Sequence, residues 1–198
     1  WVTAPAAPGV WLRRSAMLLG VAFLFRVTMY LASDRPEIEA IFRVDILNCL
    51  AVSMALLTPL EFMGSREGRV LVAVSSALWF AMATPMVWDG GLVDAVPKRL
   101  AAYLSGRVAN SSFPLFPWAS YAFAGHALGT IIGAARDRAM NRRMAGLLAI
   151  GLAMMPLSAA LDTLPTLGPR YDYWWTSPNF VMFKTAVLLV LVVLSFGF

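Results

Sequence analysis

The stretch NFVMFKTAVLLVLVVLSFGF, residues 179–198, contains a single charged residue, Lys184. A helix of about 20 mostly apolar residues is what crosses a hydrocarbon core about 30 Å thick. Similar blocks precede it at residues 15–33, 41–60, 70–88, 113–135 and 144–161. The polar stripes at helical spacing that a soluble helical protein needs are mostly absent from these blocks. The sequence therefore predicts an all-α, polytopic transmembrane helix bundle with about six spans.

The composition supports this prediction. Hydrophobic residues make up 60% of the 198 residues and charged residues 14%, whereas soluble domains have about 45–50% and about 25%. Six spans leave room for one transmembrane domain, residues 1–198, and for no soluble domain. Cys49 is the single cysteine, which excludes an internal disulfide framework and a multi-cysteine metal site. We expect no metal and no nucleic-acid partner.

Neither end of the chain resembles a natural protein terminus. The chain begins at Trp1 and stops at Phe198, inside an apolar run. No segment has the form of a cleavable signal peptide. We therefore expect the chain to be a fragment of a longer polypeptide.

Basic residues in short flanking segments predict the orientation of such a bundle. One side collects eight of them: Arg13, Arg14, Arg66, Arg69, Arg136, Arg138, Arg142 and Arg143. The other side collects six: Arg35, Arg43, Lys98, Arg99, Arg107 and Arg170. We expect the first side to face the cytoplasm and the protein to lie in a bacterial inner membrane.

Residues 89–112 then form an outer connection. In it, Val96, Leu100, Leu104 and Val108 recur at helical spacing. This pattern predicts a short amphipathic helix that lies on the outer surface or caps the bundle.

A second outer segment, residues 162–178, contains four aromatic residues, Tyr171, Tyr173, Trp174 and Trp175. Aromatic rings are enriched at membrane–water interfaces. An aromatic belt is the first interpretation of these residues, and a substrate-binding role for Trp175 is the alternative.

Asp45 and Asn48 are three residues apart in FRVDILNCLAVSM and so share a helical face. We place Asp45 about one turn inside the second span, where a charged group needs a partner because it is costly in hydrocarbon. Arg26 and Arg43 are the candidate partners. An Arg–Asp clamp between the first two helices and a substrate site around Asp45 and Asn48 both remain open.

The fourth span holds His126, the single histidine, and three glycines spaced by four, Gly125, Gly129 and Gly133. Such a glycine stripe lets another helix approach closely, so we expect this helix to be central to packing. His126 is either a packed, hydrogen-bonding residue or part of a substrate site that uses its proton chemistry.

Two further basic features have open interpretations. Lys184 lies about one turn inside the last span, and its stem is long enough to reach the outer headgroups. The loop with Arg136, Arg138, Arg142 and Arg143 is either an ordinary cytoplasmic anchor or a site for anionic lipid or the phosphates of an acyl-CoA.

Three stretches in the same order resemble one family. FRVDILNCLAVSMALL, FPLFPWASYAFAGHALG and YDYWWTSPNFVMFKTAVLLVLVVL are similar to helices and a loop of the heparan-α-glucosaminide N-acetyltransferase-like membrane proteins. The resemblance covers most of the chain. It implies a polytopic acyltransferase fold that moves an acetyl group from cytosolic acetyl-CoA to a sugar amine or hydroxyl across the membrane.

The resemblance also shows a departure. The family's key histidine and asparagine lie on an early helix that has no counterpart in residues 1–198, so His126 is not assigned their role. An acyltransferase is therefore the first hypothesis. A non-catalytic subunit of a larger membrane complex is the second, and a transporter is the third. The lipid bilayer, other membrane subunits or further copies of the chain are the expected partners.

Overall fold

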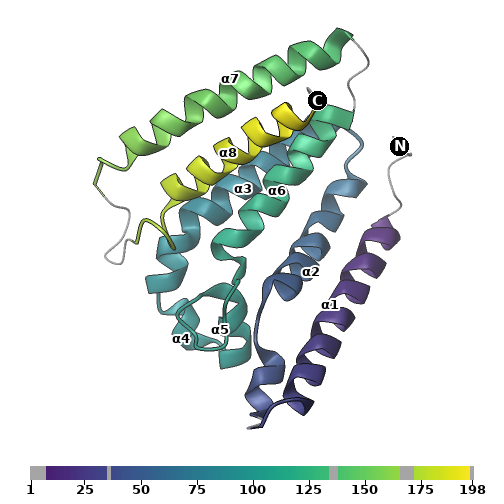
Figure 1. Cartoon of the computed structure of the whole chain (residues 1–198), viewed down its shortest axis with the longest axis vertical. Coiled ribbons are helices and arrows are strands. Elements are labelled where there is room, and N and C mark those ends of the chain that lie inside the picture. The colour runs from purple at the N-terminus through teal and green to yellow at the C-terminus, as the bar shows by residue number, and fades with distance from the viewer. Residues whose placement is uncertain (1–7, 35–36, 134–137, 166–171, 197–198) are drawn as a thin grey trace.

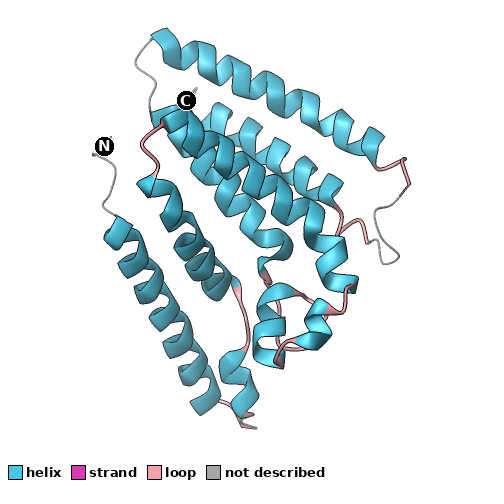
Figure 2. Cartoon of the chain, turned by 180° about the vertical axis from the view of Figure 1, so that it is seen from behind, coloured by secondary structure: helices cyan, strands magenta, loops and turns pink. Residues whose placement is uncertain are grey.

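The structure, a computed structural model, describes residues 8–34, 37–133, 138–165 and 172–196. Its elements are all helical and are joined by short connections (Figures 1 and 2). They are α1 (Pro8–Leu31), η1 (Ile38–Phe42), α2 (Ile46–Leu57), η2 (Thr58–Phe62), α3 (Arg66–Asp89), α4 (Leu92–Ala95), α5 (Lys98–Leu104), α6 (Leu115–Gly133), α7 (Arg138–Leu161) and α8 (Pro178–Phe196), where η marks a 3-10 helix.

The predicted all-α membrane bundle is confirmed, and each of the six predicted spans corresponds to a helix. In the described residues, four helices are long and apolar enough to cross a membrane, namely Gly9–Leu31, Arg66–Asp89, Met140–Leu161 and Pro178–Phe196. The chain is thus an integral membrane protein.

The two remaining predicted spans form shorter helical segments. The helix α2 gives way to the 3-10 turn η2 at Thr58, where Pro59 follows. The helix α6 contains a kink at Phe116, whose backbone is extended (φ −95°, ψ 115°) and precedes a cis bond to Pro117. Proline disfavours the helical conformation in the residue before it, which accounts for this break. Pro85 and Pro156, by contrast, lie inside α3 and α7 without ending them.

The core lies where α2, α3 and α6 meet. Phe80 of α3 contacts two rings of α6, with centroid distances of 4.9 Å to Phe116 and 5.5 Å to Phe123. Rings at these distances add specific contacts to the burial of apolar area. The helix α6 is therefore central to packing, as the sequence predicted, but the contacts are made by its aromatic face.

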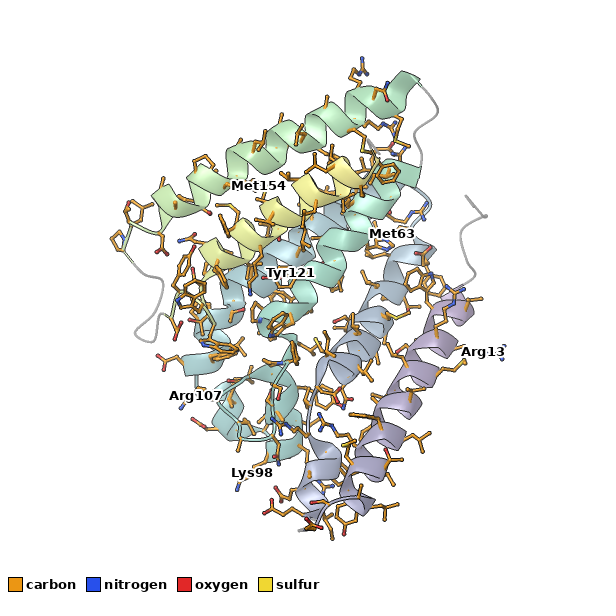
Figure 3. The ribbon with its side chains drawn as sticks, in the orientation of Figure 1. Arg13, Met63, Lys98, Arg107, Tyr121 and Met154 are labelled. Atoms are coloured by element: carbon orange, nitrogen blue, oxygen red, sulfur yellow. The ribbon has the colours of Figure 1, made fainter. Side chains whose placement is uncertain are left out.

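The outer helices are less enclosed. At one edge α1 packs against α2, and at the opposite edge α7 packs against α8 (Figures 1 and 2). The start of α1 and the end of α8 lie toward one end, which we name the Arg13 end, and α4 and α5 lie at the other, which we name the Lys98 end (Figures 1 and 3).

The short helix predicted between residues 89 and 112 is present as α5 (Lys98–Leu104), but the predicted apolar stripe is wrong. Val96 is extended (φ −106°, ψ 155°) and separates α4 from α5, because Pro97 follows it. The Leu100 side chain is exposed, whereas Ala101 and Ala102 are buried. The buried face of α5 is thus formed by alanines and not by the predicted stripe.

The start of the second span also differs from the prediction. Asp45 is not inside a helix but is the extended residue that precedes α2. Val44 forms a parallel β-bridge with Ser111, and this pairing keeps the chain extended up to Asp45.

Candidate functional site

Asp45 holds α1 and α2 together. Its Oδ2 atom lies 2.8 Å from Nη2 of Arg26, and both side chains are largely buried. Its Oδ1 atom accepts hydrogen bonds from the backbone N–H groups of Leu47 and Asn48, at 3.0 and 3.3 Å. Asp45 thus caps α2, since a side-chain oxygen there satisfies donors that the first helical turn leaves free. The predicted clamp with Arg26 is confirmed, whereas Arg43 donates to Ser112 instead.

Asn48 is fully buried beside α5. Its Nδ2 donates to the hydroxyl of Tyr103 at 3.3 Å, and its Oδ1 has no hydrogen-bond partner among the described residues. Burial raises the pKa of Tyr103 above its ordinary value, while the hydrogen bond from Asn48 acts in the opposite direction. The pair fixes α5 to α2.

His126 lies toward the Arg13 end. Its ring meets that of Trp11 edge to face, with centroids 6.1 Å apart. Nε2 is buried without a hydrogen-bond partner among the described residues. Glu61 and Arg69, which pair with each other at 3.6 Å, are near enough to act on His126 electrostatically. Among the described residues, His126 shares no hydrogen bond, ion pair or ring contact with Asp45 or Asn48.

The predicted close approach at the glycine stripe is absent from the described residues. Gly125, Gly129 and Gly133 are exposed, and a Cβ atom built on any of them would meet nothing within 4 Å. The reason is that α6 turns its aromatic face, not its glycine face, toward α2 and α3.

The basic loop is only partly described. Arg136 and the side chain of Arg138 lie outside the described residues. Arg143 donates to the carbonyl of Ile131 at 2.8 Å, and Arg66 donates to the carbonyls of Thr130 and Ile131. Cations placed on the last carbonyls of α6 complement its negative end. Arg142 is exposed and makes no such contact.

Trp175 lines a groove at the Lys98 end, which we name the aromatic groove. The groove has a volume of about 950 Å³, and its walls include Trp88, Ser112, Trp118, Trp174, Trp175 and Lys184. The indole Nε1 of Trp88 donates to the carbonyl of Phe116 at 3.0 Å, which fixes this wall. Gly106 leaves room for the indole, because a Cβ there would lie 2.5 Å from the ring of Trp88.

The turn that carries the exposed indoles is built by polar groups. Asp172 accepts from the backbone N–H of Trp174 at 2.9 Å, and its carbonyl accepts from Trp175, Thr176 and Ser177. Ser177 caps α8, since its hydroxyl accepts from the N–H groups of Asn179 and Phe180. Tyr171 lies outside the described residues.

A second groove, which we name the apolar groove, continues from the first between α2, α6 and α8. It has a volume of about 640 Å³, and Cys49, Ser53, Tyr121, Val187 and Leu188 are among its lining residues. Phe113, Trp118, Phe180 and Lys184 line both grooves. The ammonium group of Lys184 lies 4.1 Å from the ring centre of Phe180 and 5.2 Å from that of Trp118. Figure 3 labels Tyr121, which lies near the middle of the bundle.

Among the described residues, the predicted substrate residues do not share either of these two grooves. Trp175 lines the aromatic groove, while Asp45, Asn48 and His126 line neither groove. Sequence reasoning missed Trp88, Trp118 and Ser53. The Trp118 position had a signal in the motif FPW, but nothing in the sequence indicated the space beside it. In the described residues, no group of three His, Cys, Asp or Glu side chains is arranged to hold a metal ion.

Comparison with known proteins gives one match. Residues 4–161 match the family model described as "Heparan-alpha-glucosaminide N-acetyltransferase, catalytic". Neither a curated protein nor a solved structure matches the chain. The match extends from before α1 to the end of α7, so it includes Asp45, the glycine stripe and most of both groove walls. Because it covers well over half of the 198 residues, the chain belongs to the heparan-α-glucosaminide N-acetyltransferase catalytic family.

Proposed function

We propose that the protein transfers an acetyl group from acetyl-CoA at the Arg13 end to a sugar-like acceptor at the Lys98 end. The observation that carries the proposal is the family match over residues 4–161, which makes the chain an acetyltransferase-like membrane protein. In this proposal the Arg13 end faces the cytoplasm of a bacterial inner membrane.

The two ends of the bundle expose different side chains, a cation at the end proposed for acetyl-CoA and aromatic rings at the end proposed for the sugar. Arg142 is exposed beside the first turn of α7, where a cation is available to the phosphates of a CoA. At the Lys98 end, Trp174 and Trp175 are exposed on the wall of the aromatic groove. Indole rings offer flat apolar faces with a polar edge, which suits a sugar ring.

The chemistry is acyl transfer. The acceptor nitrogen attacks the thioester carbonyl carbon, a C–N bond forms, the C–S bond breaks, and CoA leaves as its thiol. The amine proton must pass to a base. The residues of this chain would bind and orient the two substrates, which supplies much of the rate gain in reactions between two molecules. By the resemblance, the base would belong to the family's early helix, and no residue of this chain is assigned that role.

The test uses the full-length protein in proteoliposomes. Radiolabelled acetyl-CoA is supplied on one side and glucosamine on the other, and labelled N-acetylglucosamine is measured. We expect transfer only when acetyl-CoA is on the side of the Arg13 end. Absence of transfer in both orientations, to free glucosamine and to lipid-linked glucosamine alike and with intact protein, would refute the proposal.

A matched pair of variants tests the direction. Arg142→Gln and Lys98→Gln each remove one exposed positive charge, the first near the start of α7 and the second at the start of α5, at opposite ends of the bundle (Figure 1). Arg142→Gln should raise the KM for acetyl-CoA about tenfold, as expected for a lost charge-assisted contact, and Lys98→Gln should leave it unchanged. The reverse result would place the donor at the Lys98 end.

One observation favours a second candidate, a non-catalytic subunit of a larger membrane complex. The glycine face of α6 is open in the described residues, and such faces bind neighbouring transmembrane helices. A purified protein that is monomeric and active in acetyl transfer would exclude this candidate.

A further inference from the structure

The two grooves form one continuous surface whose character changes along its length. The aromatic groove at the Lys98 end is lined by indoles, by Ser111 and Ser112 and by Lys184. The apolar groove that follows is lined mainly by aliphatic and aromatic side chains of α2, α6 and α8. A free, water-soluble sugar would gain little from contact with the apolar groove.

The apolar groove has the length of a lipid chain segment. It follows α8 from Phe180 to Leu188, which is about 12 Å at a rise of 1.5 Å per residue. One leaflet of the hydrocarbon core is about 15 Å deep. The groove is therefore long enough to extend through most of one leaflet from the end where the sugar is expected.

The junction of the two grooves carries a positive charge without a carboxylate. Lys184 takes part in neither of the ion pairs found among the described residues, Arg26–Asp45 and Arg69–Glu61. Lys184 instead faces the rings of Phe180 and Trp118. A cation at this depth is stabilised by an anion, and a phosphate that links a sugar to a lipid chain would reach it at this point.

We propose that the acceptor is a lipid-anchored sugar phosphate: its hydrocarbon chain occupies the apolar groove, its phosphate contacts Lys184, and its sugar lies in the aromatic groove. This inference deepens the proposed function and rests on it for the acetyl transfer, but the binding of the amphiphile is tested separately.

The binding probe is glucosamine 1-phosphate esterified to a dodecyl chain that carries bromine atoms, which quench nearby tryptophan fluorescence. The full-length protein is studied in phosphatidylcholine nanodiscs. Because Trp118 lines both grooves, we expect saturable quenching at low mole fractions of the probe, and we expect Trp118→Phe to remove the saturable part. Brominated phosphatidylcholine should give only quenching in proportion to its amount.

Three variants locate the probe. Val187→Trp fills the apolar groove, and Leu191→Trp places the same ring one turn further along α8 at an exposed position outside the lining. Val187→Trp should abolish the saturable quenching and Leu191→Trp should preserve it. Lys184→Gln should raise the mole fraction for half-saturation about tenfold, as expected for a lost charge-assisted contact, but should not affect a neutral dodecyl glucosaminide.

The outcomes separate the two proposals. Equal quenching by the probe and by brominated phosphatidylcholine would mean that bulk lipid fills the groove and would overturn the inference, as would equal effects of Val187→Trp and Leu191→Trp. Saturable binding of the probe by a protein that acetylates neither the probe nor free glucosamine would uphold the site and refute the proposed function. Acetylation of free glucosamine at the same efficiency as the lipid-linked form would uphold the function and refute the lipid-anchored acceptor.

Discussion

Replacement of Asp45 by asparagine separates the two roles of this residue. Asparagine keeps an oxygen that can accept from Leu47 and Asn48, and it is as good a helix cap as aspartate. It removes the charge that pairs with Arg26 at 2.8 Å. The variant therefore isolates the ion pair from the cap.

The magnitude follows from burial. The Arg26 and Asp45 side chains are 17% and 12% exposed. Removal of one partner from a fully buried pair costs about 3–5 kcal/mol, and an exposed pair contributes at most about 1 kcal/mol. Because Asp45 lies at the start of α2, within reach of the interface, we expect Asp45→Asn to lower the free energy of unfolding by about 2–3 kcal/mol.

Two further variants complete the series. Asp45→Ala also removes the cap and should cost about 1 kcal/mol more. Arg26→Gln combined with Asp45→Asn leaves no unpaired charge, so it should recover most of the loss that Asp45→Asn causes alone.

The assay is reversible unfolding in mixed micelles by titration with sodium dodecyl sulfate, followed by far-ultraviolet circular dichroism. A loss below about 0.5 kcal/mol for Asp45→Asn would mean that the pair is screened like a surface pair, and would refute the reasoning. If the double variant recovers no stability, the loss of unfolding free energy in Asp45→Asn does not come from the unpaired charge of Arg26.

Tyr103→Phe removes the acceptor for Asn48 and should destabilise the protein by about 1 kcal/mol at neutral pH in the same unfolding assay. Since burial raises the pKa of Tyr103 above 10.0, the folded state holds this proton more tightly than the unfolded state. The wild type should therefore lose stability as the pH rises above that value, and a parallel loss in Tyr103→Phe would contradict the assignment. Gly125→Ala should stabilise the protein by about 0.5–1 kcal/mol, because an exposed helical glycine gains from a methyl group that meets nothing. A destabilisation measured in native membranes but not in detergent would instead reveal a helix packed on that face.

Local physics made much of this protein predictable from its sequence. Backbone groups in hydrocarbon must be paired within their own segment, so long apolar blocks had to be helices, and each of the six predicted blocks contains a helix in the described residues. The cost of a charge in hydrocarbon likewise indicated that Asp45 needed a partner, and Arg26 was one of the two candidates.

Other features escaped prediction for reasons that are also local. Pro97 interrupts a hydrophobic stripe that otherwise has perfect helical spacing, and the conformational restriction on Val96 was stronger than the pattern. Asp45 ended up before its helix because Val44 pairs with Ser111, a residue far away in the sequence.

The grooves and the glycine face depended on the tertiary structure alone. Periodicity tells which residues share a helical face but not which helix covers that face, since this depends on the distances and angles at which helices pack. Thus Gly125, Gly129 and Gly133 were recognisable as a stripe, yet the structure leaves them open within the described chain. Trp118, Lys184 and Ser53 come from α6, α8 and α2, and they line one groove only because these three helices stand apart there.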